Sequence, residues 1–291
     1  MKTPVLNIEE FKTSDLLDKF YVNRFSAHLK ANKNLISHPH SHNFYLCVLF
    51  TEGSGTHEID FNSYTISPGK VFFLKPGQTH SWKFDHNPEG FIFFHSREFY
   101  EMHYVMHRLQ IFPFYYSYQN APVLDIAPEL EPFLNLFQNL YEEYGNAEPL
   151  RELKLLNNIN EIYIRLTRNY TSTIDLANYS NPTYLKILGQ LEHHIDAYFE
   201  QEKLPKFYAN LLSITTKHLN RVVNETLNKT TNQLISERVI LEAKRLIVHS
   251  TDSLAGIAEN LGFADYAYFS RYFKSKTGST PLDFRKKYLK N

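Results

Sequence analysis

Between about residues 20 and 100, apolar and polar positions alternate in short runs that Gly and Pro separate. Residues 44–50 form a continuous apolar run that ends at a Gly-Ser-Gly turn. Residues 71–74 and 91–94 are shorter apolar runs, and Pro-Gly pairs stand on both sides of the first. Several short strands at nearly even spacing are typical of an antiparallel sandwich or barrel.

Beyond residue 125 the apolar spacing changes to the pattern of amphipathic helices. One stripe lies within residues 130–144 and another within 150–166, which predicts an αα-hairpin. The hairpin either packs wholly on the strands or lends one stripe to a second subunit, because core and dimer stripes have the same spacing. The polar, turn-rich residues 171–182 then predict a linker.

The most specific pattern lies in residues 257–274, which predict a helix, a tight turn and a second helix. Gly262 ends the first helix, because glycine enters a left-handed turn without strain. Asp265 can cap the second helix, whose Phe269 and Phe273 are spaced to pack inward. This order of features predicts a helix-turn-helix unit.

A looser copy of this unit precedes it by about fifty residues. Before the turn the offset is 49, and the matches are Ala209 with Ala258, Leu212 with Leu261, and Ile214 with Phe263. After the turn the offset is 50, and the matches are Thr215 with Asp265, Leu219 with Phe269, Arg221 with Arg271, Val223 with Phe273, and Asn228 with Gly278. Two copies that keep caps, core positions and an exposed Arg indicate a duplicated unit. A helix predicted over about 231–250 would separate the two copies as a rigid spacer.

Together with the run Gly278-Ser279-Thr280-Pro281, these motifs resemble the C-terminal DNA-binding domain of the AraC/XylS family of transcription regulators, over about residues 184–287. The Pro-Gly pairs around residues 71–74, with His80 just beyond, resemble the cupin-like effector domain that often precedes it. The resemblance implies an α+β chain: an N-terminal cupin-like antiparallel β-barrel with a helical hairpin, and a C-terminal all-α domain with two helix-turn-helix motifs. The expected boundaries are 1–125 for the effector domain, 126–170 for the hairpin (a candidate dimerisation element), 171–182 for the linker and 183–291 for the DNA-binding domain, with helix-turn-helix units at about 205–227 and 253–276.

Charge is divided unevenly along a chain whose formal net charge is zero. Residues 203–291 hold 15 Lys and Arg against 7 Asp and Glu, so this segment is basic and the remainder is acidic. A basic module beside an acidic domain fits a nucleic-acid partner. The single cysteine rules out an internal disulfide, and no apolar run reaches the ~20 residues of a membrane span. We expect a cytoplasmic protein without a membrane partner.

The exposed faces of the two recognition helices carry side chains that suit the major groove. Arg pairs with guanine O6 and N7, and Asn pairs with adenine N6 and N7. By match to the family motif, the predicted base-reading residues are Lys217, Asn220, Arg221, Tyr266, Ala267, Tyr268 and Arg271. The predicted backbone contacts, which position a protein without reading sequence, are His218, Lys274, Lys276, Arg285, Lys286 and Lys287. The first unit is expected to read more of the sequence than the second.

The histidine-rich run at residues 38–42 is the feature that hints at catalysis. With His80, its His38, His40 and His42 resemble the histidines that hold a metal in cupins, but residues 44–47 lack the expected carboxylate. We therefore expect no metal, no cofactor and no catalytic residue. The histidines would instead lie on a polar rim or contact an organic effector. The predicted effector residues are His40, Tyr45, His57, His80 and Trp82.

The expected function is sequence-specific transcription regulation under the control of a small-molecule effector, with activation favoured over repression. The expected partners are double-stranded DNA, a second copy of the chain, and RNA polymerase if the protein is an activator. Two alternatives remain open. One is an effector-independent DNA-binding protein with a structural barrel, and the other is a metal-cupin enzyme fused to a DNA-binding domain.

Overall fold

The structure is a computed structural model that describes residues 4–11, 19–101, 109–116, 120–172 and 182–289 of the chain. The chain divides into two compact units near residue 175, which we call the N-terminal unit and the C-terminal unit. Most of the predicted linker, residues 173–181, lies outside the described residues. The fold class predicted from the sequence is confirmed, because an antiparallel sheet forms the first unit and helices form the second.

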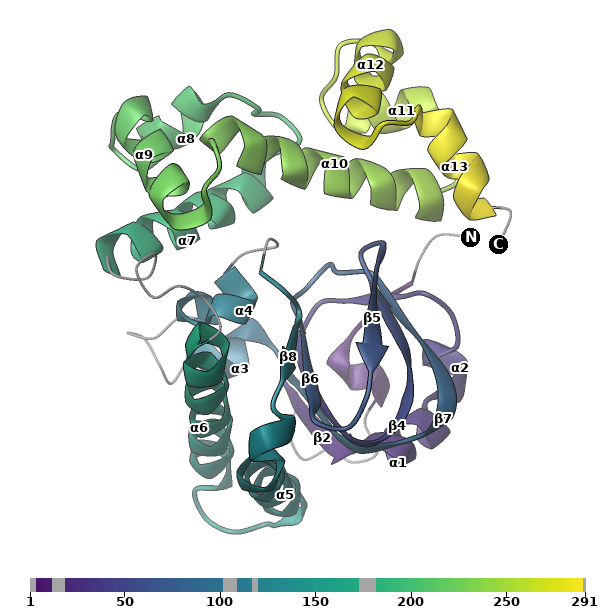
Figure 1. The fold of residues 1–291 in the computed structure, drawn as a ribbon, viewed down its shortest axis with the longest axis vertical. Coiled ribbons are helices and arrows are strands. Elements are labelled where there is room, and N and C mark those ends of the chain that lie inside the picture. Colours follow the sequence, from purple (N-terminus) through teal and green to yellow (C-terminus); the bar gives the residue numbers. More distant parts are fainter. Residues whose placement is uncertain (1–3, 12–18, 102–108, 117–119, 173–181, 290–291) are drawn as a thin grey trace. The chain divides into compact units, whose positions relative to one another are not determined.

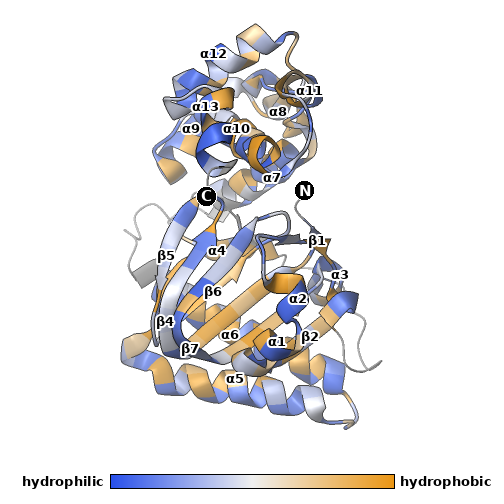
Figure 2. Cartoon of the chain, turned by 90° about the vertical axis from the view of Figure 1, so that its right-hand side faces the viewer, coloured by the Kyte–Doolittle hydropathy of each residue, from blue (hydrophilic) through white to orange (hydrophobic). Residues whose placement is uncertain are grey.

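A strongly curved six-stranded sheet forms the centre of the N-terminal unit (Figure 1). Its strands lie in the order β2-β7-β4-β6-β8, with β5 paired to β4, and all of these pairs are antiparallel. The strands are β2 (Phe20–Arg24), β4 (Tyr45–Ile59), β5 (Asn62–Ile66), β6 (Lys70–Leu74), β7 (His80–His95) and β8 (Val123–Asp125). The register of β4 against β7 shifts between Phe50 and Gly55, and such bulges bend a strand. The middle of these strands is largely apolar in Figure 2, as a sheet covered on both faces requires.

One face of this sheet, which we call the helix face, packs against the helices that follow the strands. Its apolar side chains share one core cluster with α5 and α6. The helices on this side of the chain are α3 (Arg97–Glu101), η2 (Leu109–Ile111), α4 (Pro113–Tyr116), η3 (Ala127–Glu129), α5 (Leu130–Gly145) and α6 (Arg151–Ser172). The α5–α6 pair confirms the predicted hairpin.

Most apolar side chains in the two stripes of the hairpin are buried within the N-terminal unit. Phe133, Phe137 and Leu140 of α5 are buried, and so is the α6 stripe from Leu155 to Tyr170. Leu150 and Leu153, at the start of the second stripe, remain exposed. Most of both stripes therefore packs inside the N-terminal unit, whereas the exposed start of the second stripe does not.

The opposite face, which we call the histidine face, packs against the amino-terminal segments. Leu6, Ile8 and Phe11 join the apolar cluster of this face together with Phe25 of α1. A short parallel pair, β1 (Val5–Leu6) with β3 (Ser41–His42), ties the amino-terminal segment to the histidine-rich run. The remaining elements here are η1 (Ile8–Phe11), α1 (Phe25–Ala31) and α2 (Lys33–Ile36).

The C-terminal unit is all helical within its described residues, with the long helix α10 between two smaller groups of helices (Figure 1). The helices are α7 (Pro182–Tyr198), α8 (Pro205–Leu211), α9 (Thr216–Leu227), α10 (Thr231–His249), α11 (Leu254–Asn260), α12 (Tyr266–Thr277) and α13 (Pro281–Leu289). The pairs α8–α9 and α11–α12 are the two predicted helix-turn-helix units, and α10 is the predicted spacer between them.

The two helix-turn-helix units match in their turns, their caps and the hydrogen bonds of their turns. In the turns, Ser213 and Gly262 both have positive φ, at 54° and 70°. The amide of Ile214 donates to Ala209 O at 3.0 Å, as the amide of Phe263 donates to Ala258 O at 2.9 Å. The second helix of each unit begins at a capping side chain, Thr215 or Asp265, and ends at a left-handed residue, Asn228 or Gly278. The repeat inferred from sequence spacing is therefore a repeat of structure.

Candidate nucleic-acid interface and buried histidine cluster

The helix α9 presents a polar face opposite its buried side. Leu219, Val222 and Val223 pack inward, whereas Lys217, Asn220 and Arg221 are exposed and His218 is half-buried. The Thr215 hydroxyl accepts from the His218 amide at 3.1 Å and fixes the start of the helix. The structure thus brings the four predicted DNA-contact residues of the first unit to one helix.

The guanidinium of Arg221 is held by neighbours that sequence reasoning missed. Its Nη2 donates to His218 Nδ1 at 2.9 Å, and its Cζ lies 5.9 Å from the ring centre of Tyr184 on α7. The rings of Tyr184 and His218 meet edge to face at 5.9 Å. These contacts limit the rotamers of an exposed side chain, so Arg221 would lose less entropy on binding a partner than an unrestrained side chain would.

The helix α12 of the second unit presents Tyr266, Ala267, Tyr268 and Arg271 to solvent. Phe269 and Phe273 anchor the opposite side of the helix in the core. The ring of Tyr268 lies 5.8 Å from that of Phe263, so this tyrosine leans on the turn between the two helices. The face is more aromatic and less charged than that of α9, in keeping with the expected division between the two units.

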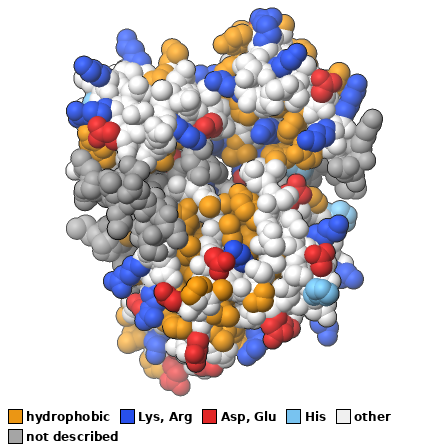
Figure 3. All heavy atoms as spheres, in the orientation of Figure 1, with side chains coloured by type: hydrophobic (Ala, Val, Ile, Leu, Met, Phe, Trp, Pro, Cys, Tyr) orange, Lys and Arg blue, Asp and Glu red, His pale blue; other side chains and the backbone are white. Residues whose placement is uncertain are grey.

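Basic side chains are numerous on the exposed surface of the C-terminal unit, as Figure 3 shows. Lys274, Lys276, Lys286 and Lys287 are exposed. Arg285 behaves differently, because its guanidinium donates to the backbone oxygens of Ile247 and Asp252 at 2.8 and 2.9 Å. These bonds hold α13 to the end of α10, and they give Arg285 a structural role that the sequence did not indicate.

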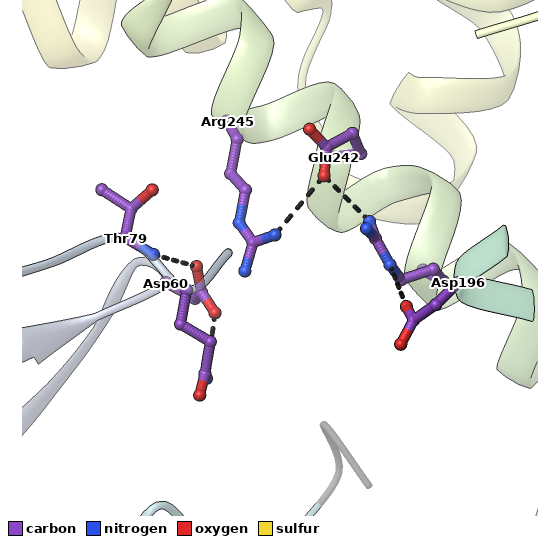
Figure 4. Close-up of polar contacts among 7 residues, drawn as sticks. Asp60, Thr79, Asp196, Glu242 and Arg245 are labelled. Atoms are coloured by element: carbon purple, nitrogen blue, oxygen red, sulfur yellow. Dashed lines mark hydrogen bonds and ion pairs between the residues drawn. The ribbon is translucent and has the colours of Figure 1, made fainter. Parts of the chain in front are cut away.

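The spacer α10 is joined to α7 by a chain of ion pairs (Figure 4). Arg238 donates to Asp196 at 2.7 Å and to Glu242 at 2.9 Å, and Arg245 lies 3.4 Å from Glu242. The Arg238 guanidinium also lies 4.0 Å from the ring centre of Phe199.

Figure 4 also shows a contact in the N-terminal unit, where Asp60 accepts a hydrogen bond from the Thr79 amide.

The histidine face of the sheet holds a group that we call the histidine cluster. It is formed by the buried His40, His42, His57 and His80 together with the half-buried Trp82. The register pairs His57 with Trp82 across β4 and β7, and an isolated bridge pairs His40 with His80. The His57 Nε2 and His80 Nδ1 atoms are 3.0 Å apart and share one hydrogen. Within the described residues, four buried atoms of the cluster have no hydrogen-bond partner: His42 Nε2, His57 Nδ1, His80 Nε2 and Trp82 Nε1.

Burial makes the histidines of this cluster neutral. Burial, with a smaller contribution from the neighbouring His40, lowers the pKa of His42 to about 3. Burial also holds the pKa values of His57 and His80 well below the usual value, again with a contribution from nearby imidazoles. The group therefore offers hydrogen-bond donors and acceptors without a net charge.

One predicted effector residue does not belong to this cluster. Tyr45 lies on the helix face, where its ring stacks on His95 at 5.7 Å and meets Tyr115 edge to face at 5.0 Å. Successive residues of a strand point to opposite faces, so an assignment that is wrong by one position selects the wrong face. Tyr45 therefore lies apart from His40, His57, His80 and Trp82, and its contact with an effector stays a prediction, whereas His42 lies with those four.

The described residues contain no group of three or more His, Cys, Asp or Glu side chains arranged to hold a metal ion. In the histidine cluster, His42 Nδ1 donates to Phe44 O at 2.7 Å and His40 Nδ1 donates to His38 O at 3.0 Å. These bonds fix two tautomers, and His38 itself is exposed.

One family model matches part of the N-terminal unit, and another matches part of the C-terminal unit. The AraC-like ligand binding domain matches residues 28–157, and a helix-turn-helix domain matches residues 208–287. The first match contains the whole histidine cluster, and the second contains both recognition helices. The chain belongs to the AraC family of transcription regulators. It is therefore a DNA-binding transcription regulator with a ligand-binding domain.

Several known proteins are similar to this chain along most of its length. The transcriptional activator RhaS of Citrobacter koseri is 22% identical over 258 residues, covering 84% of this chain and 86% of RhaS. RhaS of Escherichia fergusonii is 24% identical over 252 residues with the same coverage. Among solved structures, ToxT of Vibrio cholerae with an unsaturated fatty acid bound is 15% identical, covers 94% of this chain and 97% of ToxT, and gives a TM-score of 0.43.

The helices of the described segments do not meet the requirements for crossing a bilayer. Each of them is too short or too polar to span one. The long helices α6, in the N-terminal unit, and α10, in the C-terminal unit, each place their apolar residues in a stripe that the core of their own unit covers.

Proposed function

We propose that this AraC-family regulator binds an uncharged small molecule at the histidine cluster and adjusts its contact with DNA in response. The observation that carries this proposal is the set of four buried polar atoms without partners on one face of the sheet. Each such atom costs about 1–3 kcal/mol when it is left unsatisfied. A ligand that satisfied all four would recover that cost on binding.

The tautomers of the cluster define what such a ligand must offer. His42 Nδ1 donates to a carbonyl, so its Nε2 is an acceptor, and Trp82 Nε1 is always a donor. The bond between His57 and His80 leaves one further donor and one further acceptor, whichever ring donates. Two donors and two acceptors beside the rings of Phe72 and Trp82 suit a neutral molecule with hydroxyl or amide groups.

The DNA contacts of this proposal lie on α9 and α12. The exposure of Lys217, Arg221, Tyr268 and Arg271 supports their predicted contact with base edges, and the exposed lysines of α12 and α13 support contact with phosphates. Activation, through RNA polymerase, is proposed because RhaS is named as an activator. A homodimer is also proposed, with the exposed Leu150 and Leu153 of the hairpin as apolar positions open to a partner.

The test is a thermal-shift screen of the full chain against neutral metabolites and their matched carboxylates, with Zn²⁺ and Fe²⁺ as separate arms. A ligand that binds only the folded state must raise the melting temperature. We expect a neutral compound to raise it by several degrees and to change the affinity for selected DNA. The variant His57→Phe should lose both effects, and the exposed-site variant His86→Ala should keep them.

Three results would overturn the proposal. Stabilisation by a carboxylate but not by its neutral counterpart would mean that the site binds an anion and not an uncharged molecule. Stoichiometric binding of a metal through the cluster would restore the metal-cupin alternative. DNA binding that every compound in the screen leaves unchanged would point to an effector-independent regulator.

A further inference from the structure

The side chain of Asn220 reaches from one helix to the start of the next. Its Oδ1 accepts from the backbone amide of Thr231 at 2.8 Å. Thr231 is the first residue of α10 and is fully buried, so its amide has no access to water. A buried amide of this kind needs a partner, and Asn220 supplies it across eleven residues of sequence.

The second copy of the repeat shows the same junction without this bond. At the offset of 50, Ser270 occupies the position of Asn220, and Pro281 occupies the position of Thr231. The register is secure, because Thr230 caps α10 and Thr280 accepts from the Asp283 amide at the start of α13. Proline has no amide hydrogen, so the second junction has no donor to satisfy and no need of an asparagine.

We infer that Asn220 is a positioning residue that joins the recognition helix α9 to the spacer α10, and that it does not read adenine. A bidentate contact with adenine needs both the oxygen and the amide group of the side chain. In this structure the oxygen is committed to Thr231. Base reading by the first unit then rests on Lys217 and Arg221. This inference depends on the first unit binding DNA, but the bond itself can be tested without DNA.

The experiment gives the first copy the arrangement of the second copy, in which a proline without an amide hydrogen begins the helix. Asn220→Ala removes the acceptor and leaves the buried amide unpaired, whereas Thr231→Pro removes that amide. The site accepts proline, because Thr230 is extended (φ −87°, ψ 154°) and the Thr231 hydroxyl makes no hydrogen bond with the described residues. The full chain, both single variants and the double variant are unfolded in a calorimeter. Trp82 fluorescence reports the unfolding of the N-terminal unit. The other transition is assigned to the C-terminal unit, and its temperature is compared among the four proteins.

Asn220→Ala should lower that transition by roughly 5 °C, the shift expected from one unsatisfied amide in a unit of this size. Adding Thr231→Pro should restore most of the loss. Selection from a random DNA library should return the same base preferences for all four proteins, with affinity reduced about equally on every sequence for Asn220→Ala alone.

Two results would overturn the inference. If Thr231→Pro failed to rescue Asn220→Ala in calorimetry, the bond would not couple the two helices. If Asn220→Ala and the double variant both relaxed the preference at one base pair, Asn220 would be a base reader. Should the unaltered chain select no DNA sequence, the proposed function would fail while the calorimetric result still decided the role of Asn220.

Discussion

The two helix-turn-helix units differ more in the contacts of single residues than in their folds. Arg221 is held by His218 and Tyr184, whereas its counterpart Arg271 stands on an exposed face beside aromatic side chains. A guanidinium already oriented loses less freedom when it meets a base. The proposed base-reading side chain of the first helix-turn-helix unit is therefore held more firmly than its counterpart in the second.

For this reason Arg221→Ala should cost about 1–3 kcal/mol of DNA-binding free energy, concentrated at one base pair. Affinities for a selected site and its single-base variants would measure the effect. Lys274→Ala is the matched control, since a phosphate contact should weaken binding on every sequence alike. Equal weakening on all sequences by Arg221→Ala would make it a phosphate contact instead.

At the scale of elements, the helix α6 is fastened to the sheet by a buried polar chain. The Tyr163 hydroxyl donates to His95 Nε2 at 2.8 Å, and His95 Nδ1 donates to Ser96 O at 2.9 Å. The Tyr115 hydroxyl lies 3.1 Å from that of Tyr163. Burial lowers the pKa of His95 to about 4, so its ring is neutral and keeps an acceptor for Tyr163.

Tyr163→Phe should leave His95 Nε2 without a donor and reduce the free energy of unfolding of the N-terminal unit by about 1–3 kcal/mol. Urea unfolding followed by the fluorescence of Trp82, the single tryptophan of the chain, measures this unit. Tyr198→Phe, at an exposed position of α7, should leave the same curve unchanged. An unchanged curve for Tyr163→Phe would show that the bond adds nothing to the attachment of α6.

At the scale of the whole molecule, the two units should respond differently to acid. Burial lowers the pKa of His28 and His42 to about 3 and of His95 to about 4, all in the N-terminal unit. The unfolded chain takes up protons near the ordinary value of 6.5, before the folded unit does. Stability from these groups is therefore complete above about pH 6.5 and is lost as the pH falls toward 4.

We expect the Trp82 transition to move to lower urea between pH 7.5 and 5, with each buried histidine contributing up to about 1.4 kcal/mol per pH unit. The helical signal of the C-terminal unit should move less. His86→Ala, at an exposed histidine, should leave the slope unchanged. A parallel shift of both transitions would contradict this account.

Local sequence was enough to determine the elements and the repeat. Caps, glycine turns and helical spacing act within a few residues, so the offset of 49 and then 50 predicted two matching units, and the helices begin and end as expected. The hairpin after residue 125 followed from its period in the same way.

Only the tertiary structure decided which side chains meet. Tyr45 lies on the helix face because strand register sets the face, and register depends on pairing with distant strands. Asn220 is committed to Thr231, and Arg221 rests on Tyr184, because α9 packs between α7 and α10. The sequence by itself determined where the two helix-turn-helix units lie and which faces of their second helices are polar. Packing between helices decided which of those polar side chains are tied to neighbouring helices, because those contacts join residues that no local pattern connects.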